Sequence, residues 1–193
     1  MIRTLWQRGT MLLLLAAGAT AFSPTAAAAP YAADLVGFDE LRIHYPMLDG
    51  VDDVTALPQR IAVIDTGVQF DHPDLGGAVI GGANYAAGAT YGSESPAAWV
   101  DQNGHGTGVT GVIASASPSR PGVLPDVEII SVRVLAANGE GSFLDLTRAL
   151  QWVEQHAAAL NITAVNMSLG TASTYESDAA VPNYFYMPSM RDA

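Results

Sequence analysis

A histidine between two glycines is the residue of this sequence best suited to move protons. His105 lies in the run Asp-Gln-Asn-Gly-His-Gly-Thr-Gly-Val-Thr-Gly at 101–111. Because Gly104 and Gly106 have no Cβ, the backbone can turn sharply there and approach a ligand closely. An imidazole can accept and release a proton near neutral pH. Taken alone, however, the run favours an ordinary surface histidine in a glycine-rich turn.

An aspartate at the end of an apolar run changes that balance. Ile61-Ala62-Val63-Ile64 is rich in β-branched residues and is followed at once by Asp65. This pattern predicts a central parallel strand, buried on both faces, with a carboxylate at its C-terminal tip. Sites in open α/β sheets lie at that edge. There, Asp65 could fix the tautomer of His105 and stabilise the imidazolium. The alternative is a turn residue that accepts backbone N–H bonds.

The two runs together are more specific than either alone. The run at 61–68 and the run at 101–111 resemble the Asp and His boxes of the subtilisin-like serine proteases, and Val-Asn-Met-Ser-Leu-Gly at 165–170 resembles the substrate-binding strand of that family. The resemblance implies an α/β, three-layer fold with a mainly parallel central sheet. It also implies serine endopeptidase chemistry that needs no cofactor. In that chemistry, Asp65 orients the ring and His105 acts as general base and then as general acid.

The expected substrate-binding residues come from the same resemblance. Ser168, Leu169 and Gly170 match the segment that lines the primary specificity pocket, and by that match Ser168 is not a nucleophile. Gly139 and Gly141 match a glycine-rich turn at the rim of the groove, where an extended substrate can pair with the backbone. From the residues alone, this turn is an ordinary strand–helix connection. The implied partner is a peptide or protein substrate.

Two boxes of the family have no counterpart in the sequence. One carries the asparagine that donates to the oxyanion, and the other carries the serine nucleophile in a Gly-Thr-Ser-x-Ala-like run. Ser189 is followed by Met190, as in the serine box, but the preceding Gly-Thr is missing. Without a serine, a His–Asp pair has nothing to activate. We therefore expect a sheet that is incomplete at the C-terminus, and no peptidase activity of this polypeptide alone.

Two alternatives stand beside the protease interpretation. A secreted pseudoprotease would hold peptides in the groove without cleaving them. A metal hydrolase built from His72, Asp74 and His105 is disfavoured, because their spacing offers no helical i, i+4 ligand pair. A structural calcium ion would need about six to eight oxygen ligands, and Asp74 is the one candidate. We therefore expect no metal site.

The elements that must position these residues follow from hydrophobic patterning. The small apolar residues of Thr107–Ala116 predict a helix packed tightly in the interior, with His105 at its mouth. Val127–Leu135 predicts the next strand, and Ile162–Ser168 predicts another buried strand. Gly76–Val100 is rich in glycine and alanine, so we expect a surface connection with at most one short strand.

The helix between the last two strands should begin at Ser142 and end at Asn161. Asp145 follows Ser142 by three residues, which is a capping-box pattern. Strand, helix and strand at this spacing predict a right-handed βαβ unit. The stripe expected to face the sheet consists of Leu146, Leu150, Val153 and Ala157, with Trp152 and His156 partly exposed beside it.

Composition excludes two classes of site. None of the 193 residues is a cysteine, so the chain can form neither a disulfide nor a thiolate metal site. The formal charge of −11 argues against nucleic acid as a partner.

The N-terminus has the pattern of a targeting segment. Arg3 and Arg8 precede an apolar run at 11–17, and small residues at 26–29 offer cleavage points, which predicts a secretory signal peptide at 1–28. The apolar run is short for a membrane span. We expect an acidic segment at 29–60, a partial subtilisin-like peptidase domain at 61–193, and a secreted or periplasmic protein without stable membrane association after cleavage.

Overall fold

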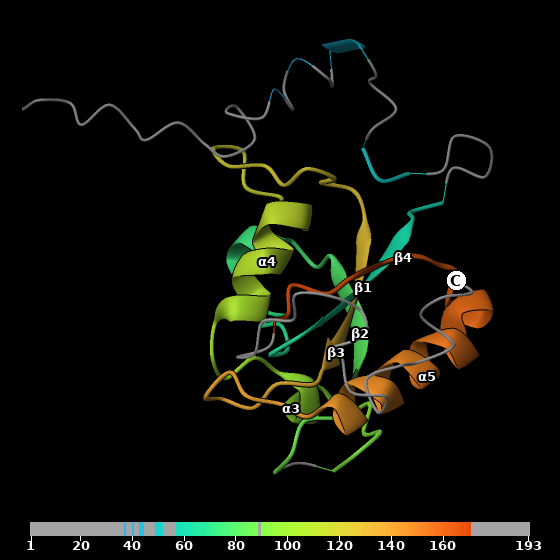
Figure 1. Cartoon of the computed structure of the whole chain (residues 1–193). Helices are drawn as coiled ribbons and strands as arrows, with labels where there is room; N and C mark the ends of the chain where they lie inside the picture. Colours follow the sequence, from blue (N-terminus) through green and yellow to red (C-terminus); the bar gives the residue numbers. More distant parts are fainter. Residues whose placement is uncertain are drawn as a thin grey trace, which may run out of the picture.

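A four-stranded parallel sheet forms the centre of the molecule. The computed structural model describes residues 57–88 and 90–170, together with 49–51 and positions 37, 40, 43 and 44. The strands are ordered β2-β3-β1-β4, and every pair is parallel (Figure 1). Their bounds are Arg60–Asp65 for β1, Val79–Asn84 for β2, Glu128–Arg133 for β3 and Ile162–Asn166 for β4.

The strand β1 is the central strand that the apolar run predicts. It pairs with β3 on one side and β4 on the other. Ala62 and Ile64 belong to one core cluster, whereas Val63 belongs to the other. Since neighbouring side chains of a strand point to opposite faces, β1 is buried on both faces. The prediction for this strand is confirmed.

Helices cover both faces of the sheet. The helix α4, His105–Ala114, packs on the face of Val63, and the helix α5, Phe143–Leu160, packs on the face of Ile64 (Figure 1). A 3-10 helix η1, Pro73–Leu75, and a short helix α3, Pro96–Trp99, lie in the connections. The three-layer α/β architecture with a parallel sheet is therefore confirmed.

The ends of α5 lie where the sequence predicts them. The Ser142 hydroxyl accepts the N–H of Asp145 at 3.1 Å and donates to its carboxylate at 2.6 Å. Asn161 ends the helix in the left-handed conformation, with φ 52°. Leu146, Leu150 and Val153 of the predicted stripe pack in one core cluster, but Ala149 and Trp152 lie in it too, and Trp152 is only 8% exposed. The prediction that Trp152 is partly exposed is wrong, since the buried face of α5 is wider than the chosen stripe.

The region Gly76–Val100 contributes more to the core than the sequence suggests. The strand β2 is six residues long and pairs with β3, and Trp99 is buried against it. Gly82 hides the strand pattern because it carries no side chain. A Cβ there would lie 2.8 Å from the Trp99 ring, so the tryptophan packs directly on the backbone. One short strand was expected in this region and is present, but the expectation of a surface connection is wrong, because Ala83 and Trp99 are buried.

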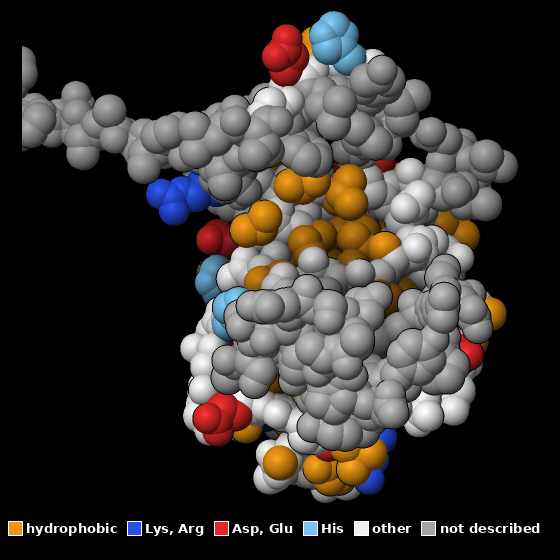
Figure 2. Space-filling model, in the orientation of Figure 1, with side chains coloured by type: hydrophobic (Ala, Val, Ile, Leu, Met, Phe, Trp, Pro, Cys, Tyr) orange, Lys and Arg blue, Asp and Glu red, His pale blue; other side chains and the backbone are white. Residues whose placement is uncertain are grey.

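Two elements predicted to be buried are partly exposed. The strand β4 ends at Asn166, lies at the edge of the described sheet, and leaves Val165 41% exposed. In α4 only Gly106, Thr110 and Ala114 are fully buried, and Val112 faces outward. Figure 2 shows apolar side chains gathered over the upper part of α4 and the neighbouring strands. Periodicity predicts the elements, but it does not predict which faces are covered.

Candidate active site

The acid at the tip of β1 contacts the histidine at the start of α4. Nδ1 of His105 lies 2.7 Å from Oδ1 of Asp65. The Asp65 side chain is fully buried, whereas that of His105 is 51% exposed. Because a carboxylate accepts, this contact favours the tautomer with the proton on Nδ1. Nε2 can then accept a proton from a group beside the half-exposed ring.

Two glycines allow this approach. Gly104 has φ 103°, which favours glycine strongly over any residue with a Cβ. A Cβ on Gly106 would lie 2.2 Å from the Gly67 carbonyl oxygen and 3.1 Å from Cβ of Asp65. The start of α4 therefore lies against the end of β1 with no room for a side chain. The Gly-His-Gly run suggested that the backbone could approach a ligand closely. In the structure, the close approach is that of α4 to the end of β1.

The Asp101 carboxylate organises the turn before His105. Oδ1 accepts the N–H groups of Asn103 and Gly104, each at 2.9 Å, and Oδ2 accepts the N–H and hydroxyl of Thr107. Partial burial of Asp101 raises its pKa, but these hydrogen bonds outweigh burial and hold the pKa below its ordinary value. The carboxylate is therefore charged, and it fixes the turn from which His105 projects.

A buried arginine supports the segment that leads into this turn. Arg133, at the end of β3, donates to the carbonyl oxygens of Ala98 and Val100 and to the side-chain oxygen of Gln102. Burial lowers the pKa of its guanidinium, and the charge of Asp101 opposes that shift. This role of Arg133 was not predicted, because an arginine inside a strand pattern gives no sign of its distant partners.

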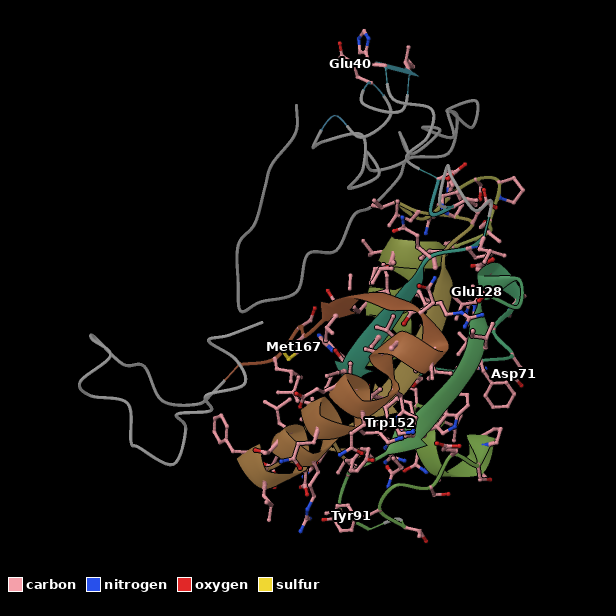
Figure 3. All side chains as sticks on the ribbon, turned by 90° about the vertical axis from the view of Figure 1, so that its right-hand side faces the viewer. Glu40, Asp71, Tyr91, Glu128, Trp152 and Met167 are labelled. Carbon is pink, nitrogen blue, oxygen red and sulfur yellow. The ribbon has the colours of Figure 1, made fainter. Side chains whose placement is uncertain are left out.

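An apolar pocket lies beside α5, with a volume of about 280 Å³. Three of the predicted substrate-binding residues line it, namely Gly141, Leu169 and Gly170. Ser168 and Gly139 are not among its lining residues. The remaining lining residues are Val134, Leu135, Ser142, Phe143, Leu146 and Met167. In Figure 3, Met167 lies on the segment that follows β4.

The two predicted residues outside the pocket occupy its surroundings. Ser168 accepts the side-chain N–H of Asn166 at 3.2 Å. Gly139, with φ 81°, belongs to a turn whose Ala137 carbonyl accepts the side chain of Asn103 at 2.9 Å. The glycine-rich turn is therefore joined to the turn that carries His105. The pocket residues Phe143 and Met167 went unpredicted, because their contacts are formed between separate elements.

The comparison with known proteins decides the family. The sequence model of the subtilase family matches residues 59–191. The chain belongs to the subtilase family. Subtilisin DY of Bacillus licheniformis is 33% identical over 116 residues, which are 59% of this chain and 38% of that protein. The thermostable alkaline protease of Halalkalibacterium halodurans is 38% identical over 116 residues, 59% of this chain and 28% of the relative.

A solved structure is also similar to part of this subtilase chain. It is described as a cold adapted subtilisin-like serine proteinase, with 32% identity and a TM-score of 0.49 over 66% of this chain and 40% of that chain. The subtilase chain thus spans 38% and 28% of the two curated relatives named above.

Two kinds of feature are absent from the described part of this subtilase. No group of three or more His, Asp or Glu side chains that could hold a metal ion occurs there. His72 instead accepts the N–H of Asp74 through Nδ1 at 3.2 Å and so caps η1. No helix among the described residues is both long enough and apolar enough to cross a membrane. The predicted signal peptide at 1–28 lies outside the described residues.

Proposed function

We propose that this chain supplies the acid–base pair of a subtilisin-type serine endopeptidase. Asp65 orients the imidazole through Nδ1, and Nε2 of His105 takes the proton of a serine hydroxyl as that hydroxyl attacks the peptide carbonyl. His105 then returns the proton to the leaving amine. The 2.7 Å contact between a buried carboxylate and a half-exposed imidazole carries this proposal.

The pocket beside α5 supports a peptide as the substrate. Leu135, Phe143, Leu146 and Leu169 give it an apolar lining that suits an apolar side chain. The backbone of the turn at Gly139–Gly141 lies between this pocket and the turn of His105, as a strand-like peptide would require. We assign Ser168, Leu169, Gly170, Gly139 and Gly141 to this groove, with no cofactor in the chemistry.

The polypeptide of 193 residues should bind the substrate without cleaving it. It contains neither a Gly-Thr-Ser run nor an Ala-Ala-Gly-Asn run. An oxyanion donor alone is typically worth ~3 kcal/mol of transition-state stabilisation. A fluorophosphonate probe should therefore leave the purified chain unlabelled, and stoichiometric labelling would overturn this part of the proposal.

The pair is tested in a complete catalytic domain. The 116 residues that align with Subtilisin DY replace their counterparts in that enzyme, and peptide hydrolysis is measured. We expect activity that falls by about four orders of magnitude in D65N and by about six in H105A, the losses that serine proteases with this pair show. D71N and H156A are matched controls, because both residues lie outside the pair and the pocket. Equal rates for H105A and H156A would refute the proposal.

A peptide-binding pseudoprotease is the second candidate, and the apolar pocket of about 280 Å³ favours it because binding a side chain there requires no serine nucleophile. Titration of the unmodified chain with peptides that differ in one side chain, alanine or leucine, measures this function. Tighter binding of the leucine peptide is expected under both candidates, whereas hydrolysis by the chimeric domain is expected only under the first.

Export of the chain is part of the proposal. We assign 1–28 to a signal peptide, 29–60 to an acidic segment and 61–193 to a partial peptidase domain, which gives a secreted or periplasmic protein. N-terminal sequencing of the exported protein should find a new terminus near Ala28. A terminus at Met1 in the exported protein would contradict the assignment.

A further inference from the structure

The helix that carries His105 has a glycine at its N-cap position, so the N-cap residue itself offers no side-chain acceptor. The first N–H groups of a helix have no partner inside the helix and are commonly accepted by a Ser, Thr, Asp or Asn side chain just before it. In α4 that position is Gly104, and no side chain of that residue can accept. Oδ1 of Asn103, in the preceding turn, accepts the N–H of His105 at 3.3 Å, and the N–H groups that follow need further acceptors outside α4.

Two side chains outside α4 supply these acceptors. The N–H of Gly106 donates to Oγ1 of Thr66 at 2.9 Å, and the N–H of Thr107 donates to Oδ2 of Asp101 at 3.0 Å. The Thr66 hydroxyl also donates to Oδ1 of Asp101 at 2.9 Å. Both hydrogen-bonding roles of this buried hydroxyl are thus engaged at the start of α4.

Thr66 is also attached to the other member of the pair. It directly follows Asp65, and its N–H donates to Oδ1 of Asp65 at 2.7 Å. Nδ1 of His105 lies within hydrogen-bond distance of the same carboxylate oxygen. One residue therefore fixes the acid through its backbone and the first turn of the histidine helix through its side chain.

We infer that Thr66 is a positioning residue that holds His105 against Asp65 by capping α4 from the end of β1. The consequence for catalysis rests on the proposed function of the pair. Thr66 acts through His105, because its hydroxyl is buried and already bonded on both sides. Because Thr66 directly follows β1, α4 receives this hydrogen bond only when it is packed against β1.

The test compares T66V with T66S in the purified chain. Valine keeps the shape of threonine without the hydroxyl, and serine keeps the hydroxyl. In T66V we expect the Gly106 amide to exchange with solvent roughly three- to tenfold faster, which matches the loss of one hydrogen bond. We also expect the NMR signal of the His105 Nδ1 proton to broaden beyond detection, because its bond to Asp65 is no longer held. T66S should keep both signals.

T163V is the matched control. The Thr163 hydroxyl donates to the Arg60 carbonyl at 3.2 Å, at the opposite end of β1, so the same substitution removes one hydroxyl bond far from the pair. Both signals should be unchanged in T163V. Wild-type signals in T66V, or loss of both signals in T66S, would overturn the inference.

Folding failure is also informative. If T66V does not fold, T66A carries the same comparison without the added methyl beside Asp101. Failure of both, with T66S folded, would show a role in the whole fold and overturn the local role. The proposed function fails separately: an inactive chimeric domain whose Nδ1 signal depends on the Thr66 hydroxyl refutes the chemistry and leaves the positioning role intact.

Discussion

Replacing Asp101 by asparagine tests how much of the site depends on one carboxylate. Asp101 accepts three bonds on Oδ1, from Thr66, Asn103 and Gly104, and two on Oδ2, both from Thr107. In D101N an NH₂ group takes the place of Oδ2. The Thr107 hydroxyl can rotate to accept from that group, but the Thr107 N–H then faces another donor. The substitution thus leaves one donor unpaired and makes three bonds neutral.

The expected cost is about 3 kcal/mol of unfolding free energy. One unpaired donor costs ~1–3 kcal/mol, and each bond to a charged acceptor is worth about 1 kcal/mol more than a neutral one, although the terms do not add fully at a half-buried site. Urea unfolding at pH 7, followed by circular dichroism, measures it. D71N makes the same change at an exposed position and should stay within about 0.5 kcal/mol of the wild type.

The pH dependence gives the sharper result. The pKa of Asp101 is lowered from its ordinary value of 3.8, so the folded protein binds this proton less readily than the unfolded chain. The stabilisation by Asp101 is therefore complete well above pH 3.8 and is lost as the pH falls through the folded-state pKa. The gap between wild type and D101N should be constant from pH 6 to 8 and narrow on acidification. A gap that is absent at pH 7, or unchanged in acid, would refute the reasoning.

Two further predictions concern the frame around the pair. G106A should cost about 1–3 kcal/mol of unfolding free energy, because its Cβ meets the Gly67 carbonyl oxygen, whereas G108A should stabilise the protein by up to about 1 kcal/mol, because a Cβ there meets open space. Equal urea midpoints for the two variants would contradict this. R60M should lose about 1–2 kcal/mol, since Arg60 pairs with Glu128 at 2.6 Å and donates to the Leu160 carbonyl at 2.8 Å. E128Q keeps the bond from Arg60 to the Leu160 carbonyl, so it should lose less unfolding free energy than R60M. A lower midpoint of thermal unfolding for E128Q than for R60M would contradict this prediction.

The elements that the sequence predicts well are those whose signal is local. The run at 61–64 is apolar and β-branched, and the capping pair at Ser142 and Asp145 is separated by one turn, so strand and helix start can be read from a few neighbours. The contact of Asp65 with His105 was also predicted. Its support came from two runs that resemble one family, with the strand tip supplying the geometry.

The predictions that were wrong or missing concern contacts with residues far away in the sequence. In the sequence, Gly82 resembles a loop residue, and its place in a strand follows only from its contact with Trp99. Trp152 lies outside the predicted stripe, and its burial follows only from the packing of α5 on the sheet. Likewise, no local rule indicates that Phe143 and Met167 face one pocket. These contacts join residues that are distant in the sequence, and hydrophobic periodicity does not indicate which distant residue a side chain will contact.

The start of α4 shows that a missing local signal can itself be informative. A helix whose first residues are glycine, histidine and glycine has a weak intrinsic tendency to form, because glycine is costly in helices and Gly104 cannot cap. Its first N–H groups are accepted partly by the preceding turn, through Asn103 and Asp101, and partly by Thr66 at the end of β1. In this chain, a poor helix start next to a histidine marks the point where Thr66, a residue distant in sequence, joins the turn at Asp101 in holding the pair together.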